Sequence, residues 1–566
     1  MRLSPLHHAP LLTSLLMLGP VLAGLCGVLF PALGWLPVLG GESWSLDPFR
    51  ALLATPGLWR SVALSLASGL LTTLFAMAMV IGLLGAWSGT RLFRWMVRLI
   101  SPLLSIPHAA AALGFAFLFA PSGWLVRMLS PELTGWTRPP DWFFPHDPHG
   151  LAMIAGLTIK ELPFLLLVSL AALPQTEPRR TQELARSLGY GPMMGWLHAV
   201  WPRLYRQIRL PIFAVIAYAS SVVDVALILG PTNPPPLAVQ LLRWMSDPDL
   251  SMRFLASAGA ILQLLVTLLA LAIWWAGEKI AGRLLSCLSQ TGLRFQGDDW
   301  LRRLAAIAVS MAVGVMLVGL AGLALWSFAG FWRFPDALPQ SLTLKTWRSQ
   351  WSMLLQPLAN ACLIAGLATV IAIALTLATL QARTSLGRRT TGRLSMILLY
   401  LPLIIPQVAF LFGLQLILLA MGASYMLWAM VFGHLIFTLP YCMLSLSDPW
   451  HALDPRYGQM AASLGHRSGD IFWRVRLPLL LRPVLTAAAV GFAVSIGQYL
   501  PTLLIGGGRW ETITTEAVAL SAGGNRRLIG LYALMQMLLP FAGFLVAILL
   551  PALIYKRRRG MRPAGP

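Results

Sequence analysis

The sequence is poor in charged residues and lacks the residue patterns of common enzymes. Only 11% of its 566 residues are charged, whereas 57% are hydrophobic. This composition excludes an ordinary soluble globular protein and is typical of a chain with many membrane spans. A P-loop needs a lysine directly after a glycine, and none of the four lysines has one: Lys160, Lys279, Lys345 and Lys556. Zinc-protease and serine-hydrolase motifs are also missing. The sequence therefore predicts no catalytic residues and no ATPase site of its own.

Cysteine and histidine are equally sparse. The four cysteines have no metal-type spacing, and three lie in apolar runs, so neither disulfides nor a metal site is expected: Cys26, Cys287, Cys362 and Cys442. Two pairs of histidines are close in sequence but lack the accompanying carboxylates of a metal site: His7-His8 and His146/His149. We expect no metal and no cofactor.

Long apolar runs dominate the rest of the chain. Twelve are long enough to cross a bilayer: 9–33, 61–87, 99–120, 149–173, 210–230, 254–276, 304–330, 356–380, 394–420, 425–446, 483–505 and 528–554. The first is too long for a signal peptide and is kept as a span. The predicted fold is an all-α polytopic membrane protein with about twelve transmembrane helices.

The distribution of basic residues predicts the orientation of these spans. An even number of spans puts both termini on one side, and the basic run at 556–559 places that side in the cytoplasm. The net charge of +22 is then explained by arginines at span ends, which interact with the lipid bilayer. We expect no nucleic-acid partner.

A short segment on the predicted cytoplasmic side occurs twice. Glu183-Leu184-Ala185-Arg186-Ser187-Leu188-Gly189 is followed by Pro202, and Gln459-Met460-Ala461-Ala462-Ser463-Leu464-Gly465 by Pro478. Each copy has the signals of a short helix. Pro178 and Pro455 suit a first position, Glu177 and Asp454 suit a cap, and a glycine suits the stop. The small Ala185 and Ala461 would leave one side slim for another protein.

These segments resemble the Glu-Ala-Ala…Gly…Ile-x-Leu-Pro pattern in permease subunits of ATP-binding-cassette (ABC) importers. The second copy, which ends Val475-Arg476-Leu477-Pro478, is the closer. Gln459 replaces the usual Glu, and Leu184 and Met460 replace the first Ala. The resemblance implies that 178–202 and 454–478 couple to a cytoplasmic ABC ATPase subunit, present in two copies. It also implies a periplasmic solute-binding protein and a location in the bacterial inner membrane.

The repeat extends beyond this segment and predicts the domain organisation. Pro107 and Gly114 match Pro406 and Gly413, and Leu162-Pro163 matches Leu439-Pro440, all in the same chain direction. We expect two parallel six-span units, 1–276 and 304–566, joined by a cytoplasmic linker, 277–303. The prolines within spans are expected to mark kinks.

A few polar residues within the spans are the candidates for a solute pathway. Lys160 and Glu161 lie in the fourth span and Asp224 in the fifth, where charges are costly unless paired or facing water. Two interpretations stay open: a cation pathway, or a buried Lys–acid pair. Gln498 is also a candidate, because it lies in the segment 495–517, which most resembles thiamine-type permeases of the thiamine, iron(III) and sulfate branch.

The leading hypothesis is the permease of an importer for thiamine or a related cation, driven by a separate ATPase. Iron(III) and other solutes remain alternatives. A different class of function is an ion-coupled secondary transporter that uses Lys160, Glu161 and Asp224. A membrane-embedded enzyme has no nucleophile or metal constellation in its favour.

Overall fold

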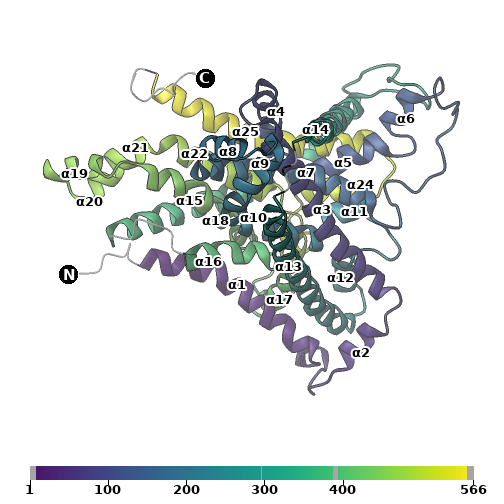
Figure 1. The fold of residues 1–566 in the computed structure, drawn as a ribbon. Helices are drawn as coiled ribbons and strands as arrows, with labels where there is room; N and C mark the ends of the chain where they lie inside the picture. The colour runs from purple at the N-terminus through teal and green to yellow at the C-terminus, as the bar shows by residue number, and fades with distance from the viewer. Residues whose placement is uncertain (1–7, 293, 295, 387–392, 557–566) are drawn as a thin grey trace.

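A computed structural model describes residues 8–292, 294, 296–386 and 393–556 (Figure 1). Two features of the sequence, His7 and the basic run at 557–559, lie outside them. The described chain is helical apart from turns, loops and two isolated bridges, Leu36–Gly41 and Ala329–Leu342. The predicted all-α class is confirmed.

We call the helices before the connection at 291–298 the first unit and those after it the second unit, after the predicted repeat. The first unit then contains α1 (Ala9–Ala32), η2 (Pro37–Leu39), α2 (Asp47–Leu53), α3 (Leu58–Trp87), α4 (Arg91–Leu103), α5 (His108–Phe119), α6 (Trp124–Leu129), α7 (Leu151–Ala172), η3 (Leu173–Thr176), α8 (Pro178–Ser187), α9 (Pro192–Ala199), α10 (Trp201–Ser221), α11 (Asp224–Leu229), α12 (Leu237–Met245) and α13 (Met252–Gln290). Those of the second unit are α14 (Asp299–Phe328), α15 (Lys345–Ser385), α16 (Arg393–Ile404), α17 (Gln407–Ala420), α18 (Leu427–Ala452), α19 (Arg456–Ser463), α20 (Ser468–Ile471), the π-helix η4 (Phe472–Arg476), α21 (Leu477–Leu479), α22 (Leu481–Ile496), α23 (Leu500–Gly506), α24 (Ile513–Ser521) and α25 (Arg526–Ile554).

Within the described ranges, nine helices are long and apolar enough to cross a membrane, and two bent pairs would bring the number to eleven. The pairs are Met396–Ile404 with Gln407–Ala420, bent by 85°, and Ser468–Leu479 with Leu481–Ile496, bent by 74°. The predicted span at 210–230 is not among them. It falls on α10 and α11, which are separated at Val222–Val223, and α10 begins with three arginines that lower its hydropathy: Arg203, Arg206 and Arg209.

The prolines expected to kink spans have two different positions. Pro163 and Pro440 lie inside α7 and α18, as predicted. Pro107 and Pro406 instead stand at the N-caps of α5 and α17, each directly after a break in the chain of helices. Proline lacks the N–H that a continuing helix would use, so it suits a new start. These two residues therefore begin new helices. At Pro406 the new helix is bent by 85° from the preceding one, so the kink predicted there takes the form of a break between two helices.

The first helix of each unit packs against a helix of the other unit. In Figure 1, α1 lies along α17, and α14 packs in the same way on α5. Both crossings pass through glycines. A Cβ on Gly413 would lie 1.9 Å from the Gly24 carbonyl oxygen, and one on Gly319 would lie 2.8 Å from that of Gly114. Glycines allow such close approach of helices in membranes. The two repeats interlock through these crossings.

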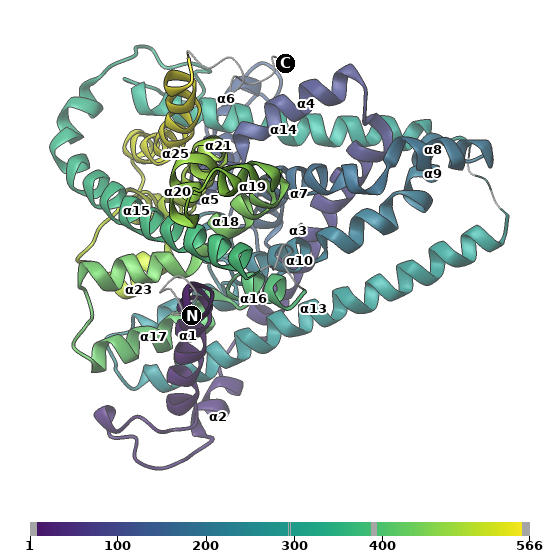
Figure 2. The ribbon, with the colours of Figure 1, turned by 90° about the vertical axis from the view of Figure 1, so that its left-hand side faces the viewer.

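The linker predicted at 277–303 is largely helical. α13 has 39 residues, about 58 Å at 1.5 Å per residue, which is longer than a bilayer core of about 30 Å. Figure 2 shows it as one long helix that reaches past α10 toward α8 and α9. Only 291–298 lies between α13 and α14. The second unit thus begins next to the repeated segment of the first.

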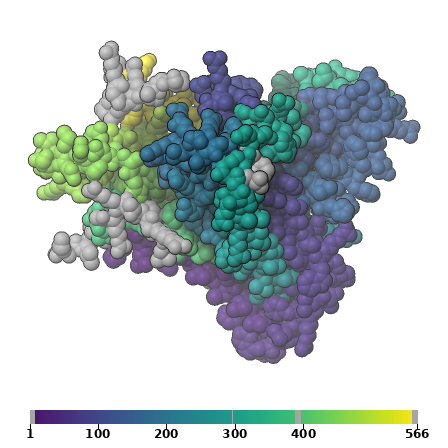
Figure 3. Space-filling view, in the orientation of Figure 1, coloured from purple at the N-terminus to yellow at the C-terminus, as the bar shows by residue number. Residues whose placement is uncertain are grey.

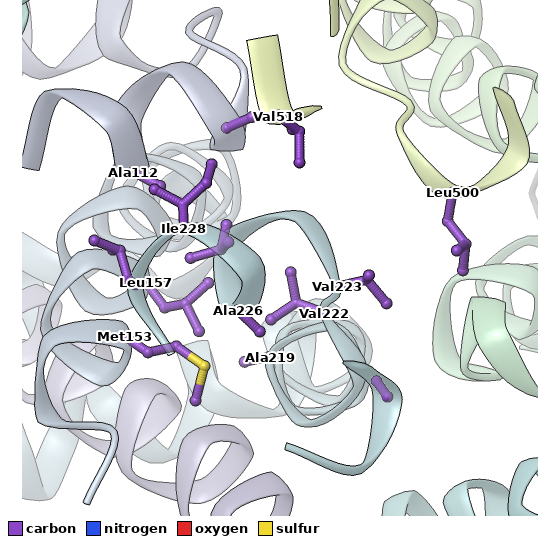
Figure 4. Close-up of a cluster of buried hydrophobic side chains, with 14 of the residues drawn as sticks. Ala112, Met153, Leu157, Ala219, Val222, Val223, Ala226, Ile228, Leu500 and Val518 are labelled. Carbon is purple, nitrogen blue, oxygen red and sulfur yellow. The ribbon is translucent and has the colours of Figure 1, made fainter. Parts of the chain in front are cut away.

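The main apolar core joins both units. It includes α3, α5, α7 and α10 of the first unit and α14, α17, α23 and α25 of the second. Figure 4 shows its part around the α10–α11 break. Val222 and Ala226 lie there beside Met153 and Leu157 of α7, and Leu500 of the second unit lies opposite. The break therefore stands close to the contact between units.

Candidate functional site

The first repeat loop (178–202) has a helix that ends as the sequence predicts. Gly189 has φ +85°, and its N–H donates to the Arg186 carbonyl at 2.9 Å. The N–H of Tyr190 donates to the Ala185 carbonyl at 3.2 Å. This pair of hydrogen bonds is the Schellman motif, which needs a left-handed residue at the helix stop. Gly189 supplies that conformation without a Cβ penalty.

The second repeat loop (454–478) ends its helix in the same way. Gly465 has φ +83°, its N–H donates to Ala462 at 3.0 Å, and that of His466 donates to Ala461 at 3.2 Å. The predicted caps differ. The Asp454 carboxylate accepts the Arg456 N–H at 2.9 Å, whereas Glu177 makes no cap hydrogen bond. Glu177 does stand at the N-cap of α8, and its carbonyl accepts the Thr181 N–H at 3.1 Å, but with φ +46° its side chain forms no cap bond. In the second loop the N-cap is Pro455, so Asp454 lies one residue before the predicted position.

The exposed faces of these helices are not the ones expected from the sequence. Ala185 and Ala461 are buried, at 5% and 7% exposure. Ala185 packs inside the loop against Gly195. A Cβ placed on Gly195 would lie 3.1 Å from the Cβ of Ala185. Small side chains here let the chain pack on itself and do not present a surface to another protein. Glu183 and Gln459 are exposed, whereas Pro202 and Pro478 are half-buried.

Four large apolar side chains occupy the exposed face. They are Leu184 at 60%, Leu188 at 64%, Met460 at 65% and Leu464 at 78% exposure. Leu184 and Leu188 are one turn apart, and Met460 and Leu464 repeat the pair 276 positions later. Sequence reasoning treated Leu184 and Met460 only as departures from a pattern. Their spacing on a polar helix was the signal that could have identified them.

The charged residues of the fourth span have partners that the sequence did not predict. Glu161 pairs with His108, with 3.0 Å between Oε1 and Nε2. Lys160 Nζ instead donates to the carbonyls of Leu103 and Leu104, at 3.4 and 3.2 Å. Because α4 ends at Leu103, its last carbonyls lack helical donors. Lys160 therefore binds the carbonyls at a helix end, and it does not form the buried Lys–acid ion pair that was one of the two open interpretations.

Asp224 lies near this pair, at the break between α10 and α11. It is 7% exposed and lies within electrostatic range of His108 and of the Tyr218 hydroxyl. The rings of His108 and Tyr218 are in contact, with centroids 4.7 Å apart. The structure thus brings Glu161 and Asp224 together around His108. The sequence analysis missed His108, although a histidine directly after Pro107 in an apolar run was a usable signal.

Gln498 belongs to a separate polar network in the second unit. Its Nε2 donates to the His434 carbonyl at 3.2 Å, and the His434 ring is bonded to the hydroxyls of Ser495 and Thr502. Gln498 precedes Tyr499, whose hydroxyl is within electrostatic range of Asp224. Among the described residues, no group of three or more His, Cys, Asp or Glu could hold a metal ion.

Comparison with known proteins places the chain in a family. No family model matches. The chain is 31% identical over 528 residues to the inner membrane ABC transporter permease protein YnjC of Escherichia coli, covering 92% of this chain and 93% of that protein. It is 26% identical over 445 residues to the thiamine transport system permease protein ThiP of Salmonella typhimurium, covering 74% of this chain and 75% of that protein. It is also 30% identical over 179 residues to the molybdenum transport system permease protein ModB of Mycobacterium tuberculosis, covering 29% and 68%. With its many membrane spans, the chain belongs to the ABC transporter permease proteins of the inner membrane.

Proposed function

We propose that this permease is the membrane subunit of an importer that moves thiamine or a related cation from the periplasm to the cytoplasm. The observation that carries the proposal is the matched pair of repeat loops, each with a Schellman-capped helix and an exposed apolar pair. A surface of this kind in equivalent places suits two copies of one partner. ABC permeases work with ATPase and solute-binding partners, so the ATPase is a separate chain.

In the proposed mechanism, each repeat loop docks on one of two ATPase subunits. Leu184 and Leu188 enter a cleft on one copy, and Met460 and Leu464 enter the same cleft on the other. Closure of the ATPases pushes on both loops, and the six-span units 1–276 and 304–566 rock against each other. Both termini then lie in the cytoplasm, and a periplasmic solute-binding protein delivers the solute from the opposite side.

Two observations support a cationic solute. Two relatives are named for thiamine transport, and two buried carboxylates, Glu161 and Asp224, lie among the apolar helices of this chain. Other relatives are named for the transport of molybdenum and of spermidine and putrescine. Other solutes therefore remain alternatives, and so does iron(III). An ion-coupled transporter is the second candidate, because Glu161 and His108 form a partly exposed pair among the apolar helices, where ionisable residues commonly mark an ion pathway.

The test is uptake of labelled thiamine by cells that have this chain, its ATPase and its binding protein, compared with cells that lack this chain alone. We expect uptake only in the first. Equal uptake in both would remove thiamine as the solute. Copurification from the native membrane tests the importer itself: a stoichiometric ATPase is expected. Ion-driven transport by the lone chain in liposomes would favour the second candidate.

A further inference from the structure

We propose that a polar cluster at the contact between the two units is a recognition site for a monovalent organic cation. The central cluster consists of His108, Glu161, Tyr218 and Asp224 from the first unit and Tyr441 and Tyr499 from the second. The proposal rests on the importer function and names the site and the chemical class of its solute.

Breaks in the helices of both units meet at this place. In the first unit, α4 and α5 are separated at Pro107 and α10 and α11 at Val222–Val223; in the second, α22 and α23 are separated by 497–499. Gly497 lies against Pro107, because a Cβ on Gly497 would be 3.9 Å from the Pro107 Cβ. Broken helices inside a membrane are tolerated where they line a solute site or are buried in protein. Here breaks from the two units converge on ionisable side chains.

The charges of the central cluster leave one carboxylate without a counter-ion. Glu161 is paired with His108, and Lys160 is engaged with the carbonyls of Leu103 and Leu104. Asp224 forms no ion pair with any residue that the structure describes. Asp224 stands in the first turn of α11, where the helix dipole favours a negative charge. A buried carboxylate in a membrane needs a compensating charge, and a monovalent cation supplies it.

Tyrosines from both units lie near the two carboxylates. Tyr218 packs against the His108 ring, with centroids 4.7 Å apart, and Tyr499 lies two residues after Gly497, which adjoins Pro107. Tyr499 and Tyr441 are within electrostatic range of Asp224 and Glu161, respectively. The three tyrosines keep part of their surface accessible, and the His108 side chain is 33% exposed. Tyrosine faces attract organic cations, whereas small inorganic cations prefer oxygen cages. The residues therefore favour an organic cation.

The two units contribute different chemistry to the site. Both carboxylates come from the first unit, and their repeat counterparts, Thr438 and Leu500, are uncharged. The second unit contributes Tyr441 and Tyr499. The site is complete only while the units are in contact, so rocking of the units would open it and release the cation.

The test is equilibrium binding of labelled thiamine, with choline as competitor, to the purified full-length chain in lipid nanodiscs without ATPase or binding protein. We expect saturable binding that choline displaces. Asp224→Asn should weaken it by about tenfold or more, because a buried charge pair loses one partner. Tyr499→Leu should weaken it several-fold, and Tyr499→Phe should restore most of the affinity because the ring face is kept. Glu132→Gln, in an exposed loop, is the acid-to-amide control and should bind as the wild type does.

Two results would overturn the proposal. One is wild-type affinity in Asp224→Asn, and the other is a wild-type chain that binds neither thiamine nor choline. If Asp224→Asn is not recovered as folded protein, the two Tyr499 variants decide. Equal binding by Tyr499→Leu and Tyr499→Phe would then count against an aromatic site. Thiamine uptake by cells with the full set of subunits is measured separately, so failure of this site is distinguishable from failure of the proposed function.

Discussion

The first repeat loop is tied to the segment that joins the two units, whereas the second is tied to helices of its own unit. In the first, Arg294 donates to the Leu188 carbonyl at 3.1 Å and to the Tyr190 hydroxyl at 3.0 Å. Gln296 donates to the Gly189 carbonyl at 3.2 Å. The carbonyls that end α8 are thus held by the connection to the second unit.

Asp298 completes this attachment at the next helix. Its buried carboxylate accepts the N–H groups of Met193 at 2.7 Å and Met194 at 3.0 Å. These are orphan donors of the first turn of α9, so Asp298 caps that helix from about a hundred residues away. Because α14 begins at Asp299, displacement of the first repeat loop would be transmitted directly to the second unit.

The second repeat loop has a different attachment. Arg476 donates to the Gln381 side chain at 2.8 Å, and the hydroxyl of Tyr555, just after α25, donates to the Pro478 carbonyl at 2.6 Å. α19, α20 and α21 project from the side of the molecule at the left of Figure 1, and the same projection is visible in Figure 3. Trp473 in this loop is 66% exposed, whereas Trp196 in the first is 0% exposed. The comparison indicates that the two loops have the same helix end but are attached to different parts of the molecule.

The largest expected effect comes from the stops themselves. Gly465→Val should abolish uptake while leaving the chain in the membrane, because a β-branched residue at φ +83° costs about 1–3 kcal/mol. A Cβ at Gly465 would meet nothing within 4 Å, so the expected loss comes from backbone strain and not from a steric clash. Gly189→Val should have a smaller effect, since Gln296 and Arg294 hold its neighbourhood. The measurements are uptake and copurified ATPase.

The control for this prediction is Gly469→Val. Gly469 lies four residues further on, in α20, where a Cβ also meets nothing within 4 Å and φ is not positive. The Gly469→Val variant should import the solute at nearly the wild-type rate. Normal ATPase association in both Gly465→Val and Gly189→Val would refute the docking role of the repeat loops.

The helix stops were predictable from the sequence because their cause is local. A glycine after a short polar helix is sufficient to predict the left-handed residue at Gly189 and Gly465. The burial of Ala185 was not predictable, because it depends on Gly195 folding back onto the same loop. The interruption of the span predicted at 210–230 was not predictable either, because a run of apolar residues does not reveal the break at Val222.

The partners of the charged residues required the folded chain. Lys160 and the carbonyl of Leu103 are 57 positions apart, and His108 and Glu161 are 53 apart. Nothing in the spacing indicates which of several donors meets the end of α4. Arg294, Gln296 and Asp298 were also invisible, since they lie outside the repeat and have no matching copy. A sequence repeat predicts the structural features that the two units share. It does not predict the contacts that connect the units.

The next effect in size concerns the attachment of the first repeat loop. Asp298→Ala leaves the N–H groups of Met193 and Met194 without their acceptor, which should cost about 1–2 kcal/mol locally. We expect faster amide hydrogen exchange in 178–202, no change in 454–478, and uptake reduced several-fold. Asp470→Ala is the control, because its pair with Arg474 is exposed and 3.7 Å long, a kind of pair worth little. Unchanged exchange in 178–202 would mean that the linker does not hold this loop.

The smallest effect is expected where the second repeat loop meets the C-terminal helix. Tyr555→Phe removes one hydrogen bond to the Pro478 carbonyl, worth about 1 kcal/mol, while Arg476 and Gln381 still hold the loop. Hydrogen exchange should rise only around 472–479, and uptake should fall by less than about twofold. Tyr457→Phe, on a 51% exposed side chain, is the control for loss of a tyrosine hydroxyl. If Tyr555→Phe matched Asp298→Ala in both measurements, the two loops would be equally anchored, and the asymmetry between their supports would have no functional consequence.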